Sequence, residues 1–306
     1  MKIFLTGATG YIGGSVAERL LREGHTITGL VRSEAGAKEI KARGMRAVLG
    51  SLDDSAVIAR AAREAEAVID TAEANHAGVV EAIASALHGS GKPFLHTSGS
   101  GIVATVANGE RSDSIYDEYS SFTPSIPRMQ QRAAIDQVVF DAATQGVRSV
   151  VIRPTMIYGE GRGARKESAQ VPALIDNAKK AGVGLHIGKG ENFWANVHID
   201  DVTELYLLAL QKAPAGALYY AENGEEILKN VAASISRMLG FGGKTRQWSP
   251  QEAEAALGPK AHSSFGSNSR VRGKRSRAEL GWQPKGRPLL EEIEHGHYKR
   301  VHRAWS

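Results

Sequence analysis

The sequence has no cysteine among its 306 residues. This excludes disulfides, iron–sulfur clusters, thiolate zinc sites and cysteine nucleophiles. It also lacks any Asn-x-Ser/Thr sequon, which agrees with the cytoplasmic location that we predict.

Long apolar runs are missing as well. No uncharged stretch approaches the roughly 18 residues of a membrane helix, and the apolar part of the opening MKIFLTGATG is too short for a signal peptide. Hydrophobic residues still make up 42% of the chain and charged residues 23%. That composition excludes disorder as the main state and provides enough apolar side chains for a buried core.

The net charge of +5 is modest, but five cations gather near the C-terminal end. They are Arg270, Arg272, Lys274, Arg275 and Arg277. This cluster is either a solvated loop or a contact for an anion such as a phosphorylated substrate. It contains no aromatic residue, so we expect no nucleic-acid partner, and we expect no membrane partner. We also expect no metal, because His295, His297 and His302 are more typical of surface histidines on a terminal amphipathic helix.

The first half alternates short apolar runs with amphipathic stretches. Strands are expected at 2–6, 25–31, 46–49, 67–70, 93–98 and 149–152, and helices at 11–23, 34–42, 55–64, 75–88 and 129–145. Such alternation predicts an α/β fold, a Rossmann-type doubly wound parallel sheet covered on both faces.

After residue 158 the pattern becomes irregular. We expect helices at 171–180, 201–212, 225–239, 250–257 and 289–299, with short strands at 184–187 and 217–221. Residues 1–158 then form a dinucleotide-binding core, to which parts of 196–221 return. Residues 159–306 form a smaller, mixed, partly helical substrate-binding lobe. The long polar segment 107–127 should also shape the substrate pocket, because loops of this length are usually functional.

A glycine loop follows the first predicted strand and opens the first helix, Thr6-Gly7-Ala8-Thr9-Gly10-Tyr11-Ile12-Gly13. Gly7 permits a tight turn, Gly10 lets the backbone approach a pyrophosphate, and Gly13 lets the helix pack close to the strand. The helix N-terminus then offers free N–H groups and a positive dipole end to phosphates.

The second strand ends Leu30-Val31-Arg32-Ser33, without the acid that would bind the ribose hydroxyls of NAD. A guanidinium there can bind a 2′-phosphate through two hydrogen bonds. Arg32 could also be an ordinary exposed cation. The pattern favours NADP(H) as the cofactor.

Six segments together resemble the extended and atypical short-chain dehydrogenase/reductase superfamily, the NAD-dependent epimerase/dehydratase-like group. Besides the glycine loop they are Val68-Ile-Asp-Thr-Ala72, His96-Thr-Ser-Gly-Ser100, Arg153-Pro-Thr-Met-Ile-Tyr-Gly159, Asn196-Val-His-Ile-Asp-Asp-Val202 and Glu279-Leu-Gly-Trp-Gln-Pro284. Their order along the chain is that of the family.

The resemblance implies a set of cofactor contacts. The glycine loop would hold the pyrophosphate, Arg32 the 2′-phosphate and Leu52 the adenine, although Ser51 stands where the family often has Asp. The remaining positions would line the ribose and nicotinamide. The full predicted set is Gly7, Thr9, Gly10, Tyr11, Ile12, Gly13, Arg32, Leu52, Thr71, Ala72, Ser98, Arg132, Pro154 and Ile157.

One departure from the family concerns its catalytic Tyr-x-x-x-Lys pair, because no Tyr in the sequence has Lys four residues later. The resemblance puts Arg128 at the Tyr position and Arg132 at the Lys position. Arg132 could still hold the ribose hydroxyls. Arg128 cannot be a general acid, because a guanidinium does not lose its proton. It could stabilise an oxyanion, or it could simply be exposed or salt-bridged.

Three substitutes for the missing proton donor remain open. Ser100 is at the position where the family keeps a hydroxyl, and Tyr158 follows Pro154 closely enough to lie near the nicotinamide. Tyr116 or Tyr119, in the polar segment, could close over the site. We take Ser100, Tyr158 and Arg128 as the catalytic candidates.

The favoured function is an NADP(H)-dependent oxidoreductase that transfers hydride between the nicotinamide and a small organic carbonyl, imine or enone. A non-catalytic NADP(H)-binding redox sensor is the first alternative, since such a branch could lose the Tyr-x-x-x-Lys pair. A sugar-nucleotide epimerase or dehydratase is the second, with Arg270 and Arg272 holding a diphosphate; Arg32 and the missing Tyr argue against it. The expected partner is a small-molecule substrate. A homodimer is one assembly open to the chain.

Overall fold

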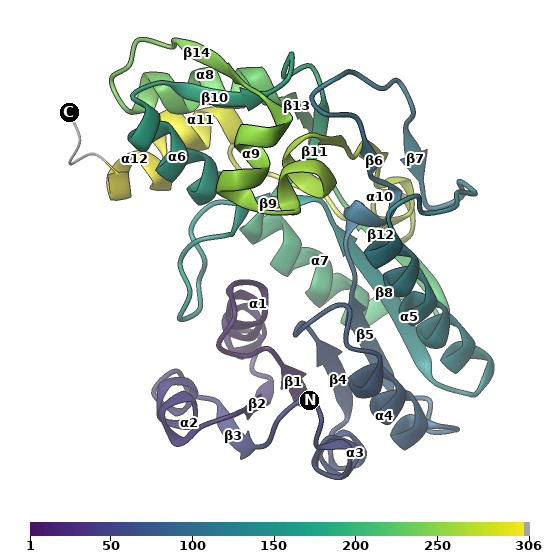
Figure 1. Cartoon of the computed structure of the whole chain (residues 1–306). Coiled ribbons are helices and arrows are strands. Elements are labelled where there is room, and N and C mark those ends of the chain that lie inside the picture. The colour runs from purple at the N-terminus through teal and green to yellow at the C-terminus, as the bar shows by residue number, and fades with distance from the viewer. Residues whose placement is uncertain (303–306) are drawn as a thin grey trace.

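A computed structural model describes residues 1–302 of the chain. Its largest sheet has seven parallel strands in the order β12-β8-β5-β4-β1-β2-β3 (Figure 1). These are β1 (Lys2–Thr6), β2 (Thr26–Val31), β3 (Arg46–Leu49), β4 (Ala67–Asp70), β5 (Pro93–Thr97), β8 (Arg148–Pro154) and β12 (Ala217–Ala221). The predicted parallel sheet is confirmed. The order in which strands are added reverses between β1 and β4, because β2 and β3 lie on one side of β1 and the later strands on the other.

Helices cover both faces of this sheet, as expected for parallel strands whose side chains are largely buried. On one face lie α1 (Tyr11–Arg22), α2 (Glu34–Lys41) and α7 (Ile199–Lys212), whose apolar residues share one core with the strands. On the other face lie α3 (Ser55–Glu64), α4 (Ala77–Leu87) and α5 (Pro127–Thr144), which share a second core. The doubly wound architecture follows from these two cores.

The later part of the chain builds a lobe above the carboxyl ends of the strands (Figure 1). Its own core joins side chains from several small elements. The strands of this lobe are β9 (Met156–Tyr158), β10 (Gly184–Ile187), β11 (Phe193–His198), β13 (Glu225–Ile227) and β14 (Thr245–Trp248). The helices are α6 (Gln170–Ala181), α8 (Leu228–Met238), α9 (Pro250–Leu257), the π-helix η2 (Ala261–Phe265), α11 (Leu289–His295) and α12 (His297–His302).

The remaining elements connect the two parts. They are the 3-10 helix η1 (Ser100–Val103), β6 (Thr105–Val106), β7 (Tyr116–Asp117), β15 (Ser267–Asn268), β16 (Val271–Arg272) and α10 (Lys274–Leu280). Two short pairings, β6 with β15 and β7 with β16, tie the polar segment to the late part of the chain. Among the described residues, no helix is long and apolar enough to cross a membrane.

Two predicted helices differ in the structure. The helix expected at 225–239 begins only at Leu228, because Glu225–Ile227 pairs with β11 as strand β13. The helix expected at 289–299 breaks at Gly296. There the Glu292 carboxylate accepts a hydrogen bond from His297 N at 2.7 Å and occupies the space that a Cβ at 296 would need.

The expectation that the terminal histidines lie on the surface is wrong for two of them. His297 is 4% exposed, and the side chain of His302 is 9% exposed. Both imidazoles lie within 4 Å of the Glu167 carboxylate. Within residues 1–302, no three His, Asp or Glu side chains are grouped as metal ligands would be.

Candidate active site

The predicted cofactor residues follow the carboxyl edge of the sheet. Leu52 comes after β3, Arg32 after β2, the glycine loop after β1, Thr71 after β4 and Ser98 after β5. In parallel sheets, ligands bind at this edge, at the point where the strand order reverses. Here that point lies between β1 and β4, directly beside the glycine loop.

The glycine loop has the geometry that a close phosphate approach needs. Gly7 has φ +74°, a left-handed conformation that favours glycine. A Cβ at Gly13 would overlap the Gly7 carbonyl oxygen and the Thr71 hydroxyl. Gly10 is the N-cap residue of α1, and within the described chain no side chain caps that end. The first N–H groups of α1 are therefore free to bind an anion.

A cavity of about 780 Å³ extends from this helix end into the lobe. Ten predicted residues line it: Gly10, Tyr11, Ile12, Thr71, Ser98, Ser100, Arg128, Arg132, Pro154 and Ile157. Gly7, Thr9 and Ala72 lie in the loops after β1 and β4, Gly13 lies in the first turn of α1, and none of the four is part of the described wall. Arg32 and Leu52 lie farther along the sheet edge, and the Arg32 side chain is exposed.

Arg132 and two serines form the floor of the cavity beyond β5. The Arg132 guanidinium lies against Gly99, the residue that separates Ser98 from Ser100 in the chain. Its Nε donates to Asn75 Oδ1 at 3.3 Å. Burial lowers the pKa of Arg132, and the neighbouring Arg128 lowers it further. Arg132 still stays protonated, so it presents a fixed positive charge to the cavity.

Ser100 has a partner that no sequence motif marks. Its Oγ lies 3.1 Å from the Oγ of Ser269, which donates the hydrogen bond. Both serines line the cavity. Two hydroxyls therefore face the space between the floor and the lobe.

Arg128 lines the same cavity but is partly engaged elsewhere. Its Nη2 donates to Glu73 Oε1 at 3.3 Å, and its side chain is 57% exposed. Arg128 is thus salt-bridged and exposed, and it still reaches the cavity wall.

The structure removes Tyr158 from the candidate donors. Its ring is fully buried in the core of the lobe, and its hydroxyl donates to the Arg287 carbonyl oxygen at 2.8 Å. The adjacent Ile157 packs toward the sheet and lines the cavity. Since neighbouring strand residues point to opposite faces, Tyr158 points away from it.

The polar segment 107–127 does not shape the pocket, contrary to expectation. Tyr116 packs against Phe122, and the exposed Tyr119 is no part of the cavity wall. The Glu118 carboxylate accepts hydrogen bonds from the backbone N of Tyr220 and Lys274, which holds the segment against β12 and the start of α10. Tyr116 and Tyr119 are therefore no longer candidates for the donor.

A buried ionic network supports the floor from below. Asp136 Oδ2 accepts hydrogen bonds from Arg153 at 2.8 and 2.9 Å and from the Ser98 hydroxyl at 3.0 Å. His96 lies next to it and bonds to Asp70 at 2.8 Å. Burial acting alone would raise the pKa of Asp70, but the hydrogen bonds and the charge of His96 outweigh it and hold that pKa below its usual value. The network fixes Ser98 and the turn after β5.

The basic cluster at 270–277 is paired with carboxylates rather than open to an anion. Arg270 and Arg272 both bind Glu225, and the other three cations bind Asp117, Glu279 and Glu222. Arg270 and Arg272, the residues weighed as holders of a diphosphate, share the Glu225 carboxylate and are no part of the described cavity wall.

Comparison with known proteins agrees with this geometry. The profile of the NAD dependent epimerase/dehydratase family matches residues 3–220. The chain belongs to this family. Membership in the NAD dependent epimerase/dehydratase family supports oxidoreductase-type chemistry with a pyridine nucleotide as cofactor.

Three similar proteins span most of the chain. Oxidase ucsJ of Acremonium sp is 31% identical over 96% of this chain and 95% of its own. The 4-hydroxy-2-methyl-3-oxo-4-farnesyl-3,4-dihydroquinoline-1-oxide ketoreductase of Stigmatella aurantiaca is 27% identical over 74% of this chain and 70% of its own. UDP-glucose 4-epimerase of Thermotoga maritima, a solved structure, has a TM-score of 0.78 at 18% identity over 99% of each chain. That last likeness shows the fold alone.

Sequence reasoning missed the part of the wall that the lobe supplies. That part of the wall mixes apolar side chains with polar and charged ones, among them Ser269, Lys260, Arg165 and Glu167. The apolar wall residues from the lobe include Met156, Ala173, Trp194, Leu257 and Phe265, and Met129 of α5 adds one from the sheet half. No motif marks these positions, because they come from separate elements and meet only when the lobe packs on the sheet.

Proposed function

We propose that this chain is an NADP(H)-dependent oxidoreductase that reduces a small organic substrate carrying a ketone, or a related imine or enone. The observation that carries the proposal is one continuous cavity. It extends from the uncapped end of α1 to the hydroxyls of Ser100 and Ser269 and then to an apolar wall. Cofactor and substrate would meet above Ser98 and Ser100.

The residues present fit a dinucleotide. Gly7 supplies the turn, Gly10 leaves the helix end open, and Tyr11 and Ile12 present N–H groups to the cavity. Arg32, exposed at the end of β2, is the residue that would select a 2′-phosphate. Bound NADP(H) would supply the hydride.

The chain's own residues would handle the charge and the proton. When the carbonyl carbon gains hydride, its oxygen becomes an alkoxide and must gain one proton. The Arg128 and Arg132 guanidiniums provide positive charge for that oxygen. The Ser100 hydroxyl, or water beside it, would deliver the proton, since Tyr11, the one Tyr in the described cavity wall, donates its hydroxyl to the Gly159 carbonyl at 2.8 Å.

The cavity wall also limits which substrates can bind. Trp194, Phe265, Met129 and Met156 offer an apolar surface beyond the reacting centre. A relative is a ketoreductase of a farnesyl-bearing quinoline. We therefore place ketones with an apolar body first among the substrates to test.

The test follows NADPH oxidation by purified protein with ketones, aldehydes, imines and enones. Consumption with an apolar ketone is the expected result. In Ser100→Ala we expect kcat to fall by about 10- to 100-fold with NADPH binding retained. In Arg32→Ala we expect NADPH binding to weaken by about tenfold and NADH binding to stay nearly unchanged.

Two outcomes would contradict the proposal. Binding of NADPH without oxidation of any substrate would favour the redox sensor. Equal loss of NADPH and NADH binding in Arg32→Ala would remove the NADP preference. A homodimer also stays a prediction, and light scattering would test it.

A further inference from the structure

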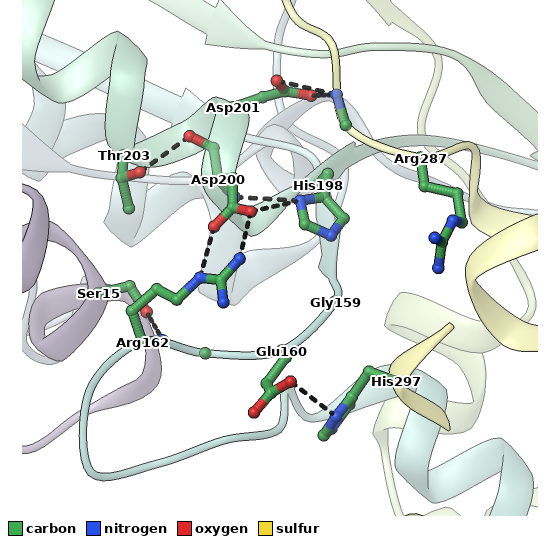
Figure 2. Close-up of polar contacts among 12 residues, drawn as sticks. Ser15, Gly159, Glu160, Arg162, His198, Asp200, Asp201, Thr203, Arg287 and His297 are labelled. Atoms are coloured by element: carbon green, nitrogen blue, oxygen red, sulfur yellow. Dashed lines mark hydrogen bonds and ion pairs between the residues drawn. The ribbon is translucent and has the colours of Figure 1, made fainter. Parts of the chain in front are cut away.

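A strap formed by residues 159–166 crosses the N-terminal part of α1. It leaves β9 at Gly159, and the Arg162 backbone N donates to the Ser15 hydroxyl at 2.9 Å (Figure 2). The Arg162 guanidinium makes a two-point contact with Asp200, at 2.9 and 2.6 Å. The strap is thereby fixed to both α1 and α7.

The strap packs closely against α1 at two glycines. A Cβ at Gly163 would fall 2.5 Å from Gly14 Cα, and a Cβ at Gly161 would fall 2.7 Å from the Tyr11 ring. Only glycine permits so close an approach. Gly161 N also donates to the Lys166 carbonyl at 2.8 Å, so the chain folds back on itself above Tyr11.

This fold-back places Arg165 in the cavity wall with Gly10, Tyr11 and Ile12. Four cations line the cavity: Arg128, Arg132, Arg165 and Lys260. The first two bond to Glu73 and Asn75. Glu167, the carboxylate of the described wall, lies near His297 and His302. Among residues 1–302, Arg165 has no hydrogen-bond or ion-pair partner, although it lies on a strap held in place on either side.

We infer that Arg165 is a cofactor-binding residue that closes on the pyrophosphate of the dinucleotide from the side opposite the glycine loop. The N–H groups of α1 would hold one face of the diphosphate and the Arg165 guanidinium the other. A guanidinium matches phosphate oxygens with two parallel hydrogen bonds. The other unpaired cation of the described wall, Lys260, lies between α9 and η2 in the lobe. Arg165 instead lies on the fold-back that packs on Tyr11, next to the glycine loop.

This inference rests on the proposed function, but it predicts a different effect on cofactor binding. Arg32 is expected to read the 2′-phosphate, which NADH lacks. The pyrophosphate is present in both dinucleotides. Arg165 should therefore contribute equally to NADPH and NADH binding, and the two arginines can be told apart by the ratio of the two affinities.

The experiment measures the Kd of NADPH and of NADH by calorimetry in wild type, Arg165→Ala, Arg165→Lys and Arg32→Ala. For Arg165→Ala we expect both Kd values to rise by the same factor, about tenfold. Arg165→Lys should recover part of the loss, because it keeps the charge and lacks the two-point geometry. The ratio of the two Kd values should change in Arg32→Ala alone.

Lys166→Ala is the matched control. It removes one positive charge from the same strap, but Lys166 is no part of the cavity wall and its Nζ donates to the Gly161 carbonyl at 3.3 Å. Its Kd values should stay within about twofold of wild type. An equal loss in Lys166→Ala and Arg165→Ala would mean a general charge effect and would overturn the inference.

Two further results would also overturn it. If wild type binds dinucleotide tightly and Arg165→Ala binds it equally well, this inference fails alone. The inference also fails alone if Arg165→Ala raises the substrate KM while the dinucleotide Kd values stay unchanged. If wild type binds neither NADPH nor NADH, the proposed function fails and this inference fails with it. Thermal unfolding of each variant, compared with wild type, shows that the exposed substitutions leave the fold intact.

Discussion

The phenol of Tyr158 is buried in the lobe, with its hydroxyl on the Arg287 carbonyl and its ring edge-on to His198. Burial, followed by nearby acids such as Asp201 and Glu292, raises its pKa. A phenol held in this way is a poor proton donor for a reaction in the cavity. Its role is to join the strand β9 to the segment that precedes α11.

Tyr158→Phe should therefore leave kcat and KM within about twofold of wild type while lowering stability by about 1 kcal/mol, since the Arg287 carbonyl loses its donor. Urea unfolding and steady-state kinetics on the same preparation would check both halves. A large fall in kcat without loss of stability would return Tyr158 to the list of donors. Ser100→Ala, which should show the reverse pattern, is the natural control.

At the scale of elements, Glu225 joins β13 to β16. Hydrogen bonds from Arg270, partly opposed by burial and supported by Arg272, lower its pKa to about 2. Arg270 also lies over the Phe193 ring of β11, 4.2 Å from its centroid. One carboxylate thus pairs with two guanidiniums, and these contacts link three short strands.

A carboxyl whose pKa is lower in the folded state stabilises the fold above its unfolded pKa of about 4.3. This contribution declines as the pH falls from about 4.5 toward 2. At pH 7 we expect Glu225→Gln to cost about 1–2 kcal/mol, because solvent screening limits the pair and two cations lose their counter-charge. Urea unfolding at pH 7 and at pH 3 should show this cost shrinking with acid.

Glu110→Gln is the control for that experiment. Glu110 pairs with Lys189 on the surface, where both side chains are more than half exposed. Exposed pairs are worth little, so this variant should lose less than about 0.5 kcal/mol. A pH-independent loss in Glu225→Gln would argue for packing rather than charge.

At the scale of the whole molecule, the cavity wall comes from the sheet half and from the lobe. A ligand bound there contacts both, and it stabilises the folded chain by mass action. At 100 times its Kd, NADPH should add about 2.7 kcal/mol, which for a chain of this size raises Tm by roughly 5 °C. Differential scanning fluorimetry with NADPH and NADH at one concentration would check this.

If Arg32 selects the 2′-phosphate, NADH at that concentration should raise Tm less than NADPH does. Equal shifts would contradict the preference, and the Arg32→Ala variant should make the two shifts equal. ATP at the same concentration controls for a general effect of anions on a basic protein.

The sequence by itself determined the sheet, the helices that cover it and the glycine loop. The ranges expected for β3, β4, α3, β10, β12 and α9 match the structure residue for residue. These features are local: apolar periodicity decides a strand or helix, and a turn such as that at Gly7 depends on one residue's φ.

Tertiary structure alone decided which side chains meet. Ser100 and Ser269 are 169 positions apart, and the strap reaches α1 only because Gly163 lies on Gly14. The partners of Arg270 and the direction of Tyr158 likewise depend on how distant segments pack. Local sequence cannot encode such contacts, since each exists only when segments far apart in the chain pack together.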